Sequence, residues 1–301
     1  MTGDEAPPPS FNWSPSPNRG GIARFAPSPS GRLHLGHAFS AVVGRSAGER
    51  FRLRIEDLDA GRCRPEHVAG IYEDLRWLGI QWDGEPLVQS ARVAAYAAAL
   101  EALRARGLVY PCFCTRADIA ASLTAPHGDA GAGYPGTCRG LPDDPARRAT
   151  TPHSWRLDSA KAVAMVGMPV WNERDGAHFT ADAGDIGDAI LARKDAPAAY
   201  HLACVVDDAA SGVDLVVRGA DLRPSTPVQR LLQMLLDLDQ PTYLHHPLVA
   251  HEVAHEEGRR LAKRDLAPTL AAMREAGVDG AALASDLAAG RLPLGFRFIN
   301  A

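Results

Sequence analysis

The sequence contains no uninterrupted apolar run of about eighteen residues, the length that a membrane-spanning helix needs. Its first residues, Met1 to Ser16, also lack the basic-then-apolar order of a secretory signal. These absences argue against membrane and secreted proteins. We therefore expect the chain in the cytoplasm, with no membrane partner.

An excess of positive charge is also missing. The formal net charge is −4 at pH 7, so the chain as a whole does not attract nucleic acid. Any RNA partner would have to contact a local basic face. Net charge therefore excludes a generally basic nucleic-acid-binding protein but not an enzyme that acts on RNA.

Regularly spaced cysteines are absent as well. The five cysteines form an odd, unevenly spaced set, and Cys112 and Cys114 lie too close together for an easy disulfide. We expect reduced thiols, some of them on a metal. Cys63 and Cys204 are interpreted as ordinary residues.

The 301 residues are 46% hydrophobic and 23% charged, which is enough for a substantial core. Residues 1–20 are rich in proline and predict a flexible tail. After them, strand patterns alternate with helix patterns, which predicts an α/β fold with a parallel sheet and crossover connections. The expected strands are Ile22 to Phe25 and Arg52 to Ile55, and the expected helices are Leu33 to Gly48, Pro65 to Leu78 and Val93 to Arg106.

The remaining part of the chain is less regular. Residues 111–152 hold cysteines and a Gly/Ala/Pro-rich loop with little periodicity, which predicts an inserted subdomain held by something other than a core. Val205 to Val217 has strand character and is expected in the parent sheet. Pro227 to Leu238 predicts an apolar helix, and the last forty or so residues predict short helices.

The turn after the first expected strand carries the most chemistry. A helix that opens just after a strand directs its free N–H groups and its dipole at a ligand beyond the strand end, which suits nucleotide phosphates. Gly31 and Gly36 would let such a ligand approach closely. His34 and His37 share one helix face, so both imidazoles can donate to one triphosphate. Taken alone, the pair could equally be two surface histidines or a weak zinc half-site.

The cysteine region suggests a metal. Cys112, Cys114 and Cys138 supply three thiolates, and Tyr134 supplies a phenol, at spacings that a loop could fold around one tetrahedral zinc ion. Zinc chemistry alone favours His127 as the fourth ligand. The alternative is three packed or solvent-facing thiols.

The segment Pro27 to His37 resembles the His-Ile-Gly-His signature of class I aminoacyl-tRNA synthetases, in the form used by glutamyl- and glutaminyl-tRNA synthetases. The resemblance implies that ATP, with Mg²⁺, is held on this helix. The implied ATP-binding residues in this segment are Pro27, Gly31, His34, Gly36 and His37.

The family's Lys-Met-Ser-Lys-Ser loop is matched more loosely by the run Arg260-Leu261-Ala262-Lys263-Arg264. Arg260 and Ala262 depart from the motif, while Lys263 keeps the lysine that would meet the triphosphate. A mobile cationic loop needs charge at the right moment more than fixed geometry, so these departures are tolerable. By resemblance, Lys263 joins His34 and His37 as a catalytic, ATP-binding residue.

Further matches follow in the family's order. Arg54 to Asp59 resembles the Arg-Ile-Glu-Asp-Thr-Asp element of glutamyl-tRNA synthetases, and Val217 to Leu222 resembles their Val-Arg-Gly-Xaa-Asp-Leu strand. Arginine grips a carboxylate in two hydrogen bonds, so arginines suit a glutamate substrate. The resemblance implies that Glu56 takes the substrate ammonium, whereas the plain alternative for Glu56 is a surface ion pair. The implied glutamate-binding residues are Arg24, Ala26, Ser28, Glu56, Tyr200 and Arg218.

The cysteine layout is similar to that of glutamyl-queuosine tRNA(Asp) synthetases, which implies Tyr134 rather than His127 as the fourth ligand of one structural zinc. That family implies a Rossmann-like catalytic core with no anticodon-binding domain. The expected divisions are a tail (1–20), the first half of the catalytic domain (21–110), an inserted acceptor-binding and zinc subdomain (111–195), the second half (196–240) and a helical C-terminal part with the Lys263 loop (241–301).

We expect a monomer, which fits a core that buries itself. The resemblance implies that the protein activates L-glutamate as glutamyl-adenylate without tRNA and transfers it to the queuosine base of tRNA(Asp). Two alternatives remain from the sequence. One is an abbreviated glutamyl-tRNA synthetase that charges the 3′ end of tRNA(Glu). The other is an inactive synthetase-like module that binds RNA, which the changes at Arg260 and Ala262 would favour.

Overall fold

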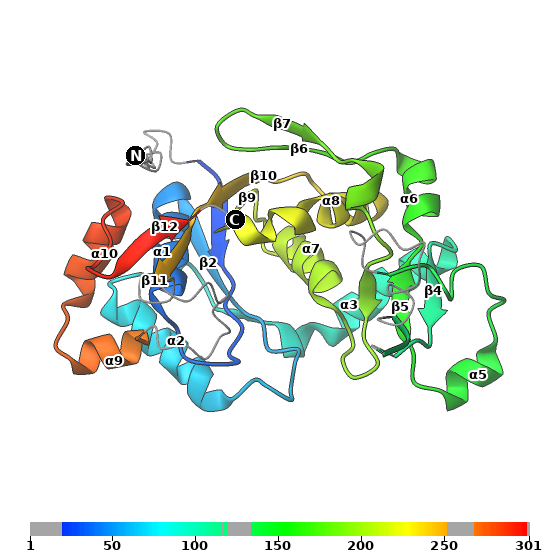
Figure 1. Cartoon of the computed structure of the whole chain (residues 1–301), viewed down its shortest axis with the longest axis horizontal. Coiled ribbons are helices and arrows are strands. Elements are labelled where there is room, and N and C mark those ends of the chain that lie inside the picture. Colours follow the sequence, from blue (N-terminus) through cyan, green and yellow to red (C-terminus); the bar gives the residue numbers. More distant parts are fainter. Residues whose placement is uncertain (1–19, 116, 120–133, 252–267, 300–301) are drawn as a thin grey trace, which may run out of the picture.

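The computed structural model describes residues 20–115, 117–119, 134–251 and 268–299. A parallel sheet of five strands lies at its centre, in the order β10-β9-β1-β2-β3 (Figure 1). The strands are β1 (Ile22–Phe25), β2 (Arg50–Ile55), β3 (Leu87–Val88), β9 (Leu215–Gly219) and β10 (Thr242–His246). The expected α/β fold with a parallel sheet is confirmed.

Successive side chains of the strands point to opposite faces of the sheet, and each face packs in its own hydrophobic core. On one face, Ala23 and Phe25 of β1 pack with Phe39 of α1. On the opposite face, Val216 of β9 packs with Leu202 of α7. The sheet is therefore covered on both sides, as parallel sheets usually are. The covering helices are α1 (Leu35–Ala47) on the first face and α7 (Tyr200–Ala210) and α8 (Thr226–Leu235) on the second.

The helices predicted in the first half of the chain are confirmed. Helix α2 (Pro65–Trp77) begins at its proline, where the missing N–H costs nothing. A turn of 3₁₀ helix, η1 (Gln89–Arg92), leads into α3 (Val93–Ala105). Gly107 follows α3 with φ of 64°, a conformation that glycine adopts without strain.

The region between α3 and α7 forms a three-stranded antiparallel sheet in the order β4-β5-β8 and a separate β6–β7 hairpin (Figure 1). Leu157 and Leu191 of this region belong to the same core cluster as Leu202 and Leu231 of α7 and α8. The elements are β4 (Val109–Cys112), α5 (Pro145–Thr150), β5 (Ser154–Leu157), α6 (Ser159–Val166), β6 (Val170–Asn172), β7 (His178–Thr180), η2 (Ala183–Asp185) and β8 (Ile190–Ala192).

The strand predicted over Val205 to Val217 is wrong in its first half. Residues Tyr200–Ala210 form α7, and the strand begins only at Leu215. Consecutive valines favour a strand locally, but burial of Leu202 and Val205 against the sheet requires helical spacing. Tertiary packing therefore overrides the local preference here.

Short helices near the C-terminus are confirmed, but a final strand was not predicted. Strand β12 pairs antiparallel with β11, and Phe298 of β12 lies 4.9 Å from Phe39 of α1 between ring centroids. Among the described residues, no helix has the length and apolar character to cross a membrane. The elements are η3 (Ala220–Ser225), β11 (Leu248–His251), α9 (Leu270–Glu275), α10 (Gly280–Ala288) and β12 (Phe296–Ile299).

Candidate active site

The sheet order changes direction at β1. Helix α1 carries the chain from β1 to β2 on one side, whereas β9 and β10 lie on the other side. Open parallel sheets bind ligands in the crevice at the carboxyl ends of the strands where such a change occurs. Residues 26–34 follow β1 at this position, and Arg218 lies near the end of β9. The expected nucleotide loop and one expected substrate arginine therefore lie at the same edge of the sheet.

His34 and His37 meet at the start of α1. His34 is the N-cap, and its Nδ1 accepts a hydrogen bond from the Gly36 N–H at 3.2 Å. His37 Nδ1 accepts from the His34 N–H at 3.2 Å, and the ring centroids are 3.9 Å apart. Because both Nδ1 atoms accept, the neutral rings carry their hydrogens on Nε2. Both rings therefore lie at the start of α1, where the helix dipole favours an anion.

The residues around the histidines have different roles in the loop. Among the described residues, no atom beyond the chain neighbours lies within 4 Å of the position that a Cβ on Gly31 would occupy, so this part of the chain leaves the space there open. A Cβ on Gly36 would instead lie 3.2 Å from the His34 ring, so this glycine makes room for a side chain of its own loop. Pro27 is buried, and its carbonyl accepts from the Glu56 N–H at 3.0 Å. That bond joins the loop to the end of β2.

Arg24 and Arg54 share one buried carboxylate from α7. Arg24 Nε donates to Asp208 Oδ1 at 3.0 Å, and Arg24 Nη1 donates to the Val217 carbonyl at 3.0 Å. Arg54 Nη1 donates to the same Asp208 oxygen. Its Nε and Nη2 donate to Glu56 Oε1 at 3.2 Å and 2.9 Å. Two arginines and two carboxyl groups therefore form one connected network at the ends of β1 and β2.

Charge and burial act in opposite directions within this network. Burial raises the pKa of Asp208, but Arg24 and Arg54 outweigh that effect and lower it to about 2. For Glu56, burial raises the pKa above its usual range although Arg54 opposes the change. Asp208 is therefore ionised at neutral pH and offsets the charge of Arg24.

Arg218 differs from Arg24 because all its partners are neutral. Its side chain is buried, and the residue is 4% exposed. Nη1 donates to Gln229 Oε1 at 2.6 Å, Nη2 to Thr226 Oγ1 at 2.7 Å, and Nε to His245 Nε2 at 3.1 Å. In the described part of the chain no carboxylate forms an ion pair with it. A buried cation without an anion is costly, so this geometry favours binding of an anionic ligand.

Two further polar atoms near Arg218 lack a partner within the described residues. Gln229 Nε2 is buried without a hydrogen bond, although the other atom of its amide accepts from Arg218. His201 Nδ1 is likewise buried and unpaired, and burial, with a smaller effect from Arg218, lowers the pKa of His201 to about 4. Buried polar groups normally have partners, so a polar ligand beside Arg218 would fit these two atoms.

The other expected glutamate residues surround the same strand ends. Ala26 and Ser28 follow β1, and Ser28 Oγ lies 3.9 Å from Cys63 Sγ. Tyr200 is the first residue of α7, and burial raises its pKa. The charged or ionisable groups that act on the Tyr200 hydroxyl are those of Cys204, Arg218, Glu56 and Arg24. Tyr200 therefore lies near Arg218, Glu56 and Arg24, which the family resemblance also implies as glutamate-binding residues.

The second signature cannot be placed. Arg260, Ala262 and Lys263 lie outside the described residues. The chain re-enters the described part at residue 268, and Thr269 pairs with His34 in an isolated antiparallel bridge. The Leu270 N–H donates to the Leu33 carbonyl at 2.9 Å. The residues that follow the second signature are therefore fixed to the start of α1.

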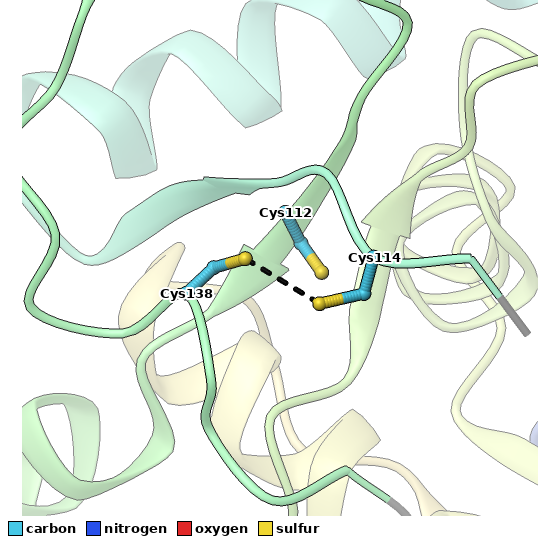
Figure 2. Close-up of side chains that lie close together, drawn as sticks. All are labelled: Cys112, Cys114 and Cys138. Carbon is cyan, nitrogen blue, oxygen red and sulfur yellow. Dashed lines mark hydrogen bonds between the residues drawn. The ribbon is translucent and has the colours of Figure 1, made fainter. Parts of the chain in front are cut away.

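Three thiols converge at the end of β4 and in the region after it, as Figure 2 shows for Cys112, Cys114 and Cys138. Their Sγ atoms all lie within 4.8 Å of one another, and Cys114 and Cys138 Sγ are 3.5 Å apart. Zn–S bonds of about 2.3 Å in a tetrahedron would give S···S distances of about 3.8 Å. The expected cluster is therefore formed, and its donors suit zinc.

Tyr134 lies beside this cluster. Its hydroxyl is 3.4 Å from Cys112 Sγ and 3.8 Å from Cys114 Sγ, and it accepts from the Cys138 N–H at 2.7 Å. The Arg156 guanidinium lies 3.8 Å from the centroid of the Tyr134 ring. His127, the other ligand considered, lies outside the described residues.

Several residues of the site were not identified from the sequence. Asp208 falls in a segment that was interpreted as a strand. Cys204, just before that segment, was regarded as ordinary although its Sγ lies 3.4 Å from Arg54 Nη2. Glu173 and His245 had no recognised motif. The adjacent acids in the run Val-Val-Asp-Asp were the available signal, since buried acids need cationic partners.

The whole chain was also compared with known proteins. Residues 22–288 match the model of the catalytic domain of class I tRNA synthetases (E and Q). The chain belongs to this family. The match confirms the predicted class I catalytic core and the assignment as a ligase-type enzyme.

Individual relatives of this synthetase cover most of its length. Glutamyl-Q tRNA(Asp) synthetase from Nocardia farcinica is 46% identical over 269 residues, which are 87% of this chain and 82% of the relative. The protein of the same name from Rhodobacter capsulatus is 43% identical over 277 residues, or 86% of this chain and 97% of the relative.

A solved structure shows the same fold. The crystal structure of a glutamate tRNA ligase from Elizabethkingia meningosepticum, in complex with its amino acid, has a TM-score of 0.71 and 26% identity to this synthetase. The match covers 89% of this chain and 60% of the ligase. The synthetase thus spans about three fifths of that longer protein.

Proposed function

We propose that this synthetase, acting as a cytoplasmic monomer, activates L-glutamate with ATP and transfers it to the queuosine base of tRNA(Asp). The observation that carries the choice of amino acid is the buried Arg218, whose partners are all neutral. The acceptor is supported by the two relatives named glutamyl-Q tRNA(Asp) synthetase, of which this chain covers 82% and 97%.

In this proposal Arg218 receives the side-chain carboxylate of glutamate. The α-carboxylate is the reacting group, and its charge is consumed when the anhydride forms. A permanent cation is therefore better matched to the side-chain carboxylate. Glu56 would accept the substrate ammonium, because its carboxylate is fixed by Arg54 at the end of β2. The other residues proposed to line the pocket are Arg24, Ala26, Ser28 and Tyr200.

ATP would bind at the start of α1. The Nε2–H groups of His34 and His37 would donate to the triphosphate, and Lys263 would add a positive charge from the second signature. Pro27, Gly31 and Gly36 would form the loop beneath the nucleotide. Mg²⁺ would arrive with ATP and neutralise part of the phosphate charge.

The chemistry needs no covalent enzyme intermediate. An oxygen of the α-carboxylate attacks the α-phosphorus of ATP, the bond to the bridging oxygen breaks, and pyrophosphate leaves. A hydroxyl of the cyclopentene-diol of queuosine then attacks the acyl carbon of glutamyl-adenylate. AMP leaves as the ester forms, and the proton of the hydroxyl passes to the phosphate of the departing AMP.

ATP–pyrophosphate exchange with each of the twenty amino acids tests the first step. Exchange with glutamate alone, without tRNA, is the expected result. Exchange that requires tRNA would instead favour charging of tRNA(Glu), in keeping with the likeness to a glutamate tRNA ligase. No exchange under any condition would leave an inactive RNA-binding module.

Labelled glutamate and purified tRNAs test the second step. We expect tRNA(Asp) bearing queuosine to be labelled and tRNA(Glu) to remain unlabelled. Removal of the 3′-terminal adenosine before the reaction should not reduce labelling, because the acceptor is a base. Labelling that this truncation abolishes would place the ester on the 3′ end and overturn this step.

Replacing His37 with alanine should raise the activation free energy of adenylate formation by about 2–4 kcal/mol, as expected for loss of one oriented hydrogen-bond donor. The rate of ATP–pyrophosphate exchange measures this loss. The glutamate affinity measured by calorimetry should barely change. His178→Ala, an exposed histidine of β7, is the control and should behave like the wild type. Equal rates for His37→Ala and wild type would remove His37 from the mechanism.

We further propose that Tyr134 is the fourth ligand of one structural zinc held by Cys112, Cys114 and Cys138. Four protein ligands leave no open position for water, which suits a structural role. The small cluster of buried residues here contains Tyr110, Cys112, Tyr134 and Cys138. Such a cluster offers little hydrophobic stabilisation, so a metal would supply what packing does not.

Replacing Cys114 with alanine should remove the metal. We expect about one zinc per wild-type chain by atomic emission and nearly none in the variant, with a melting temperature lower by several degrees. Cys63→Ala, which lies outside the cluster, should keep its zinc. Full metal content and an unchanged melting temperature in Cys114→Ala would disprove the zinc site.

A further inference from the structure

The partners of His245 determine the form of its ring. His245 is the register partner of Arg218 across the parallel pair of β10 and β9. Its Nε2 lies 3.1 Å from Arg218 Nε, and its Nδ1 lies 2.7 Å from Glu173 Oε1. Because an arginine N–H can only donate, Nε2 must be the bare acceptor. The hydrogen of the neutral ring is therefore on Nδ1 and is donated to Glu173.

Glu173 reaches this position from outside the main sheet. It follows β6 in the β6–β7 hairpin, which lies along the β10 edge (Figure 1). Glu173 forms an isolated bridge with Tyr243, and the Arg174 N–H donates to the Tyr243 carbonyl at 2.8 Å. The Glu173 side chain is 6% exposed and that of His245 is fully buried. Docking of the hairpin therefore fixes the carboxylate, and the carboxylate fixes the ring.

We propose that Glu173 and His245 are positioning residues that orient Arg218 for the substrate carboxylate and select glutamate over glutamine. This inference rests on the proposed function of Arg218. A carboxylate bonded directly to Arg218 would neutralise it and compete with the substrate. An imidazole between the two charges accepts the Arg218 hydrogen bond without supplying an anion, so the guanidinium keeps its charge for the ligand.

The groups around His245 keep it neutral. Burial lowers its pKa, and the positive charges of Arg218 and Arg223 lower it further, while Glu173 opposes them. The Tyr243 ring stacks parallel to the His245 ring at 5.9 Å, and His246 is its chain neighbour. Protonation of Nε2 would turn the acceptor into a donor facing Arg218 Nε–H. The arrangement is therefore expected to fail only on the acidic side of the usual histidine range.

Four variants test this inference: His245→Phe, Glu173→Ala, Glu173→Gln and the control His178→Ala. His245→Phe and Glu173→Ala should raise the KM for glutamate about tenfold or more, through loss of a buried hydrogen bond, with the KM for ATP within about twofold of wild type. Glu173→Gln should restore most of the affinity, since its amide oxygen can accept from Nδ1–H. His178→Ala is the control, because His178 is exposed on β7 of the same hairpin.

Two readouts separate positioning from general stability. Discrimination between glutamate and glutamine should fall in His245→Phe, because Arg218 is no longer oriented. In Glu173→Gln the acidic rise of the glutamate KM should move to lower pH, because Glu173 raises the pKa of His245. A variant that is merely less stable would show a lower melting temperature without either change.

Calorimetric titration with L-glutamate, run beside the exchange assay, separates the possible failures. If the wild type exchanges glutamate but all variants share its glutamate KM, the positioning role is wrong and the proposed function stands. If the wild type binds glutamate in a His245-dependent way but does not exchange it, positioning stands and the proposed function fails. A wild type that neither binds nor exchanges glutamate would overturn both.

Discussion

Replacing Asp208 with alanine is expected to lower the free energy of unfolding by about 3–5 kcal/mol, because Arg24 and Arg54 would remain buried without their shared counter-ion. Urea denaturation followed by circular dichroism measures the loss. Asp286→Ala removes an exposed ion pair with Arg291 and is the control, with a much smaller expected effect. Similar midpoints for the two variants would mean that the buried network adds little stability.

The same carboxylate links stability to pH. The pKa of Asp208 is about 2 in the folded chain against a usual value of 3.8. A group with a depressed folded pKa contributes stability above its unfolded pKa and loses it as pH falls towards its folded pKa. Wild type should therefore lose stability between about pH 4 and pH 2. Asp208→Ala should lack this part of the acid dependence.

Replacing Arg218 with alanine should reduce kcat/KM for glutamate by about a hundred- to a thousandfold, or about 3–4 kcal/mol, because the substrate carboxylate loses its buried cationic partner. The KM for ATP should stay close to the wild-type value, since the nucleotide is expected at α1. Steady-state exchange with varied glutamate and varied ATP measures both.

Arg218→Lys is the matched variant for that experiment. It keeps the charge but cannot hold Thr226, Gln229 and His245 in one plane, so an intermediate loss is expected. Equal effects on glutamate and ATP in Arg218→Ala would contradict the division between the two substrate sites. A large drop in melting temperature would show that the three acceptors depend on Arg218 for folding.

The sequence predicted those helix ends that are determined by residues within the same turn. Helix α2 starts at Pro65 and α3 ends before Gly107, and both signals act within one turn of the helix. The two histidines at the start of α1 lie close together in the sequence, and so do the cysteines at and after the end of β4, so both groups were visible. The family motifs then supplied the order of the remaining sites.

Contacts between residues that lie far apart in the sequence could not be predicted from local patterns. Arg24 and Asp208 are separated by 184 positions, and Glu173 and His245 by 72. The local preference of Val205 and Val206 for a strand even pointed to the wrong element, because only the packed sheet requires a helix there. The neutral surroundings of Arg218 likewise depend on β10 and α8, so the sequence ranked Arg24 and Arg218 equally.

The core shared between α7, α8 and the region from β4 to β8 limits how this enzyme can be rebuilt. Leu157 and Leu191 belong to the same hydrophobic core as Leu202 and Leu231. Deleting the region from β4 to β8 would therefore expose a hydrophobic surface on α7 and α8. A chimera that borrows the region from a relative would need complementary side chains on both halves. The small cluster of Tyr110, Cys112, Tyr134 and Cys138 is separate from that shared core, so changes within it would disturb the core less.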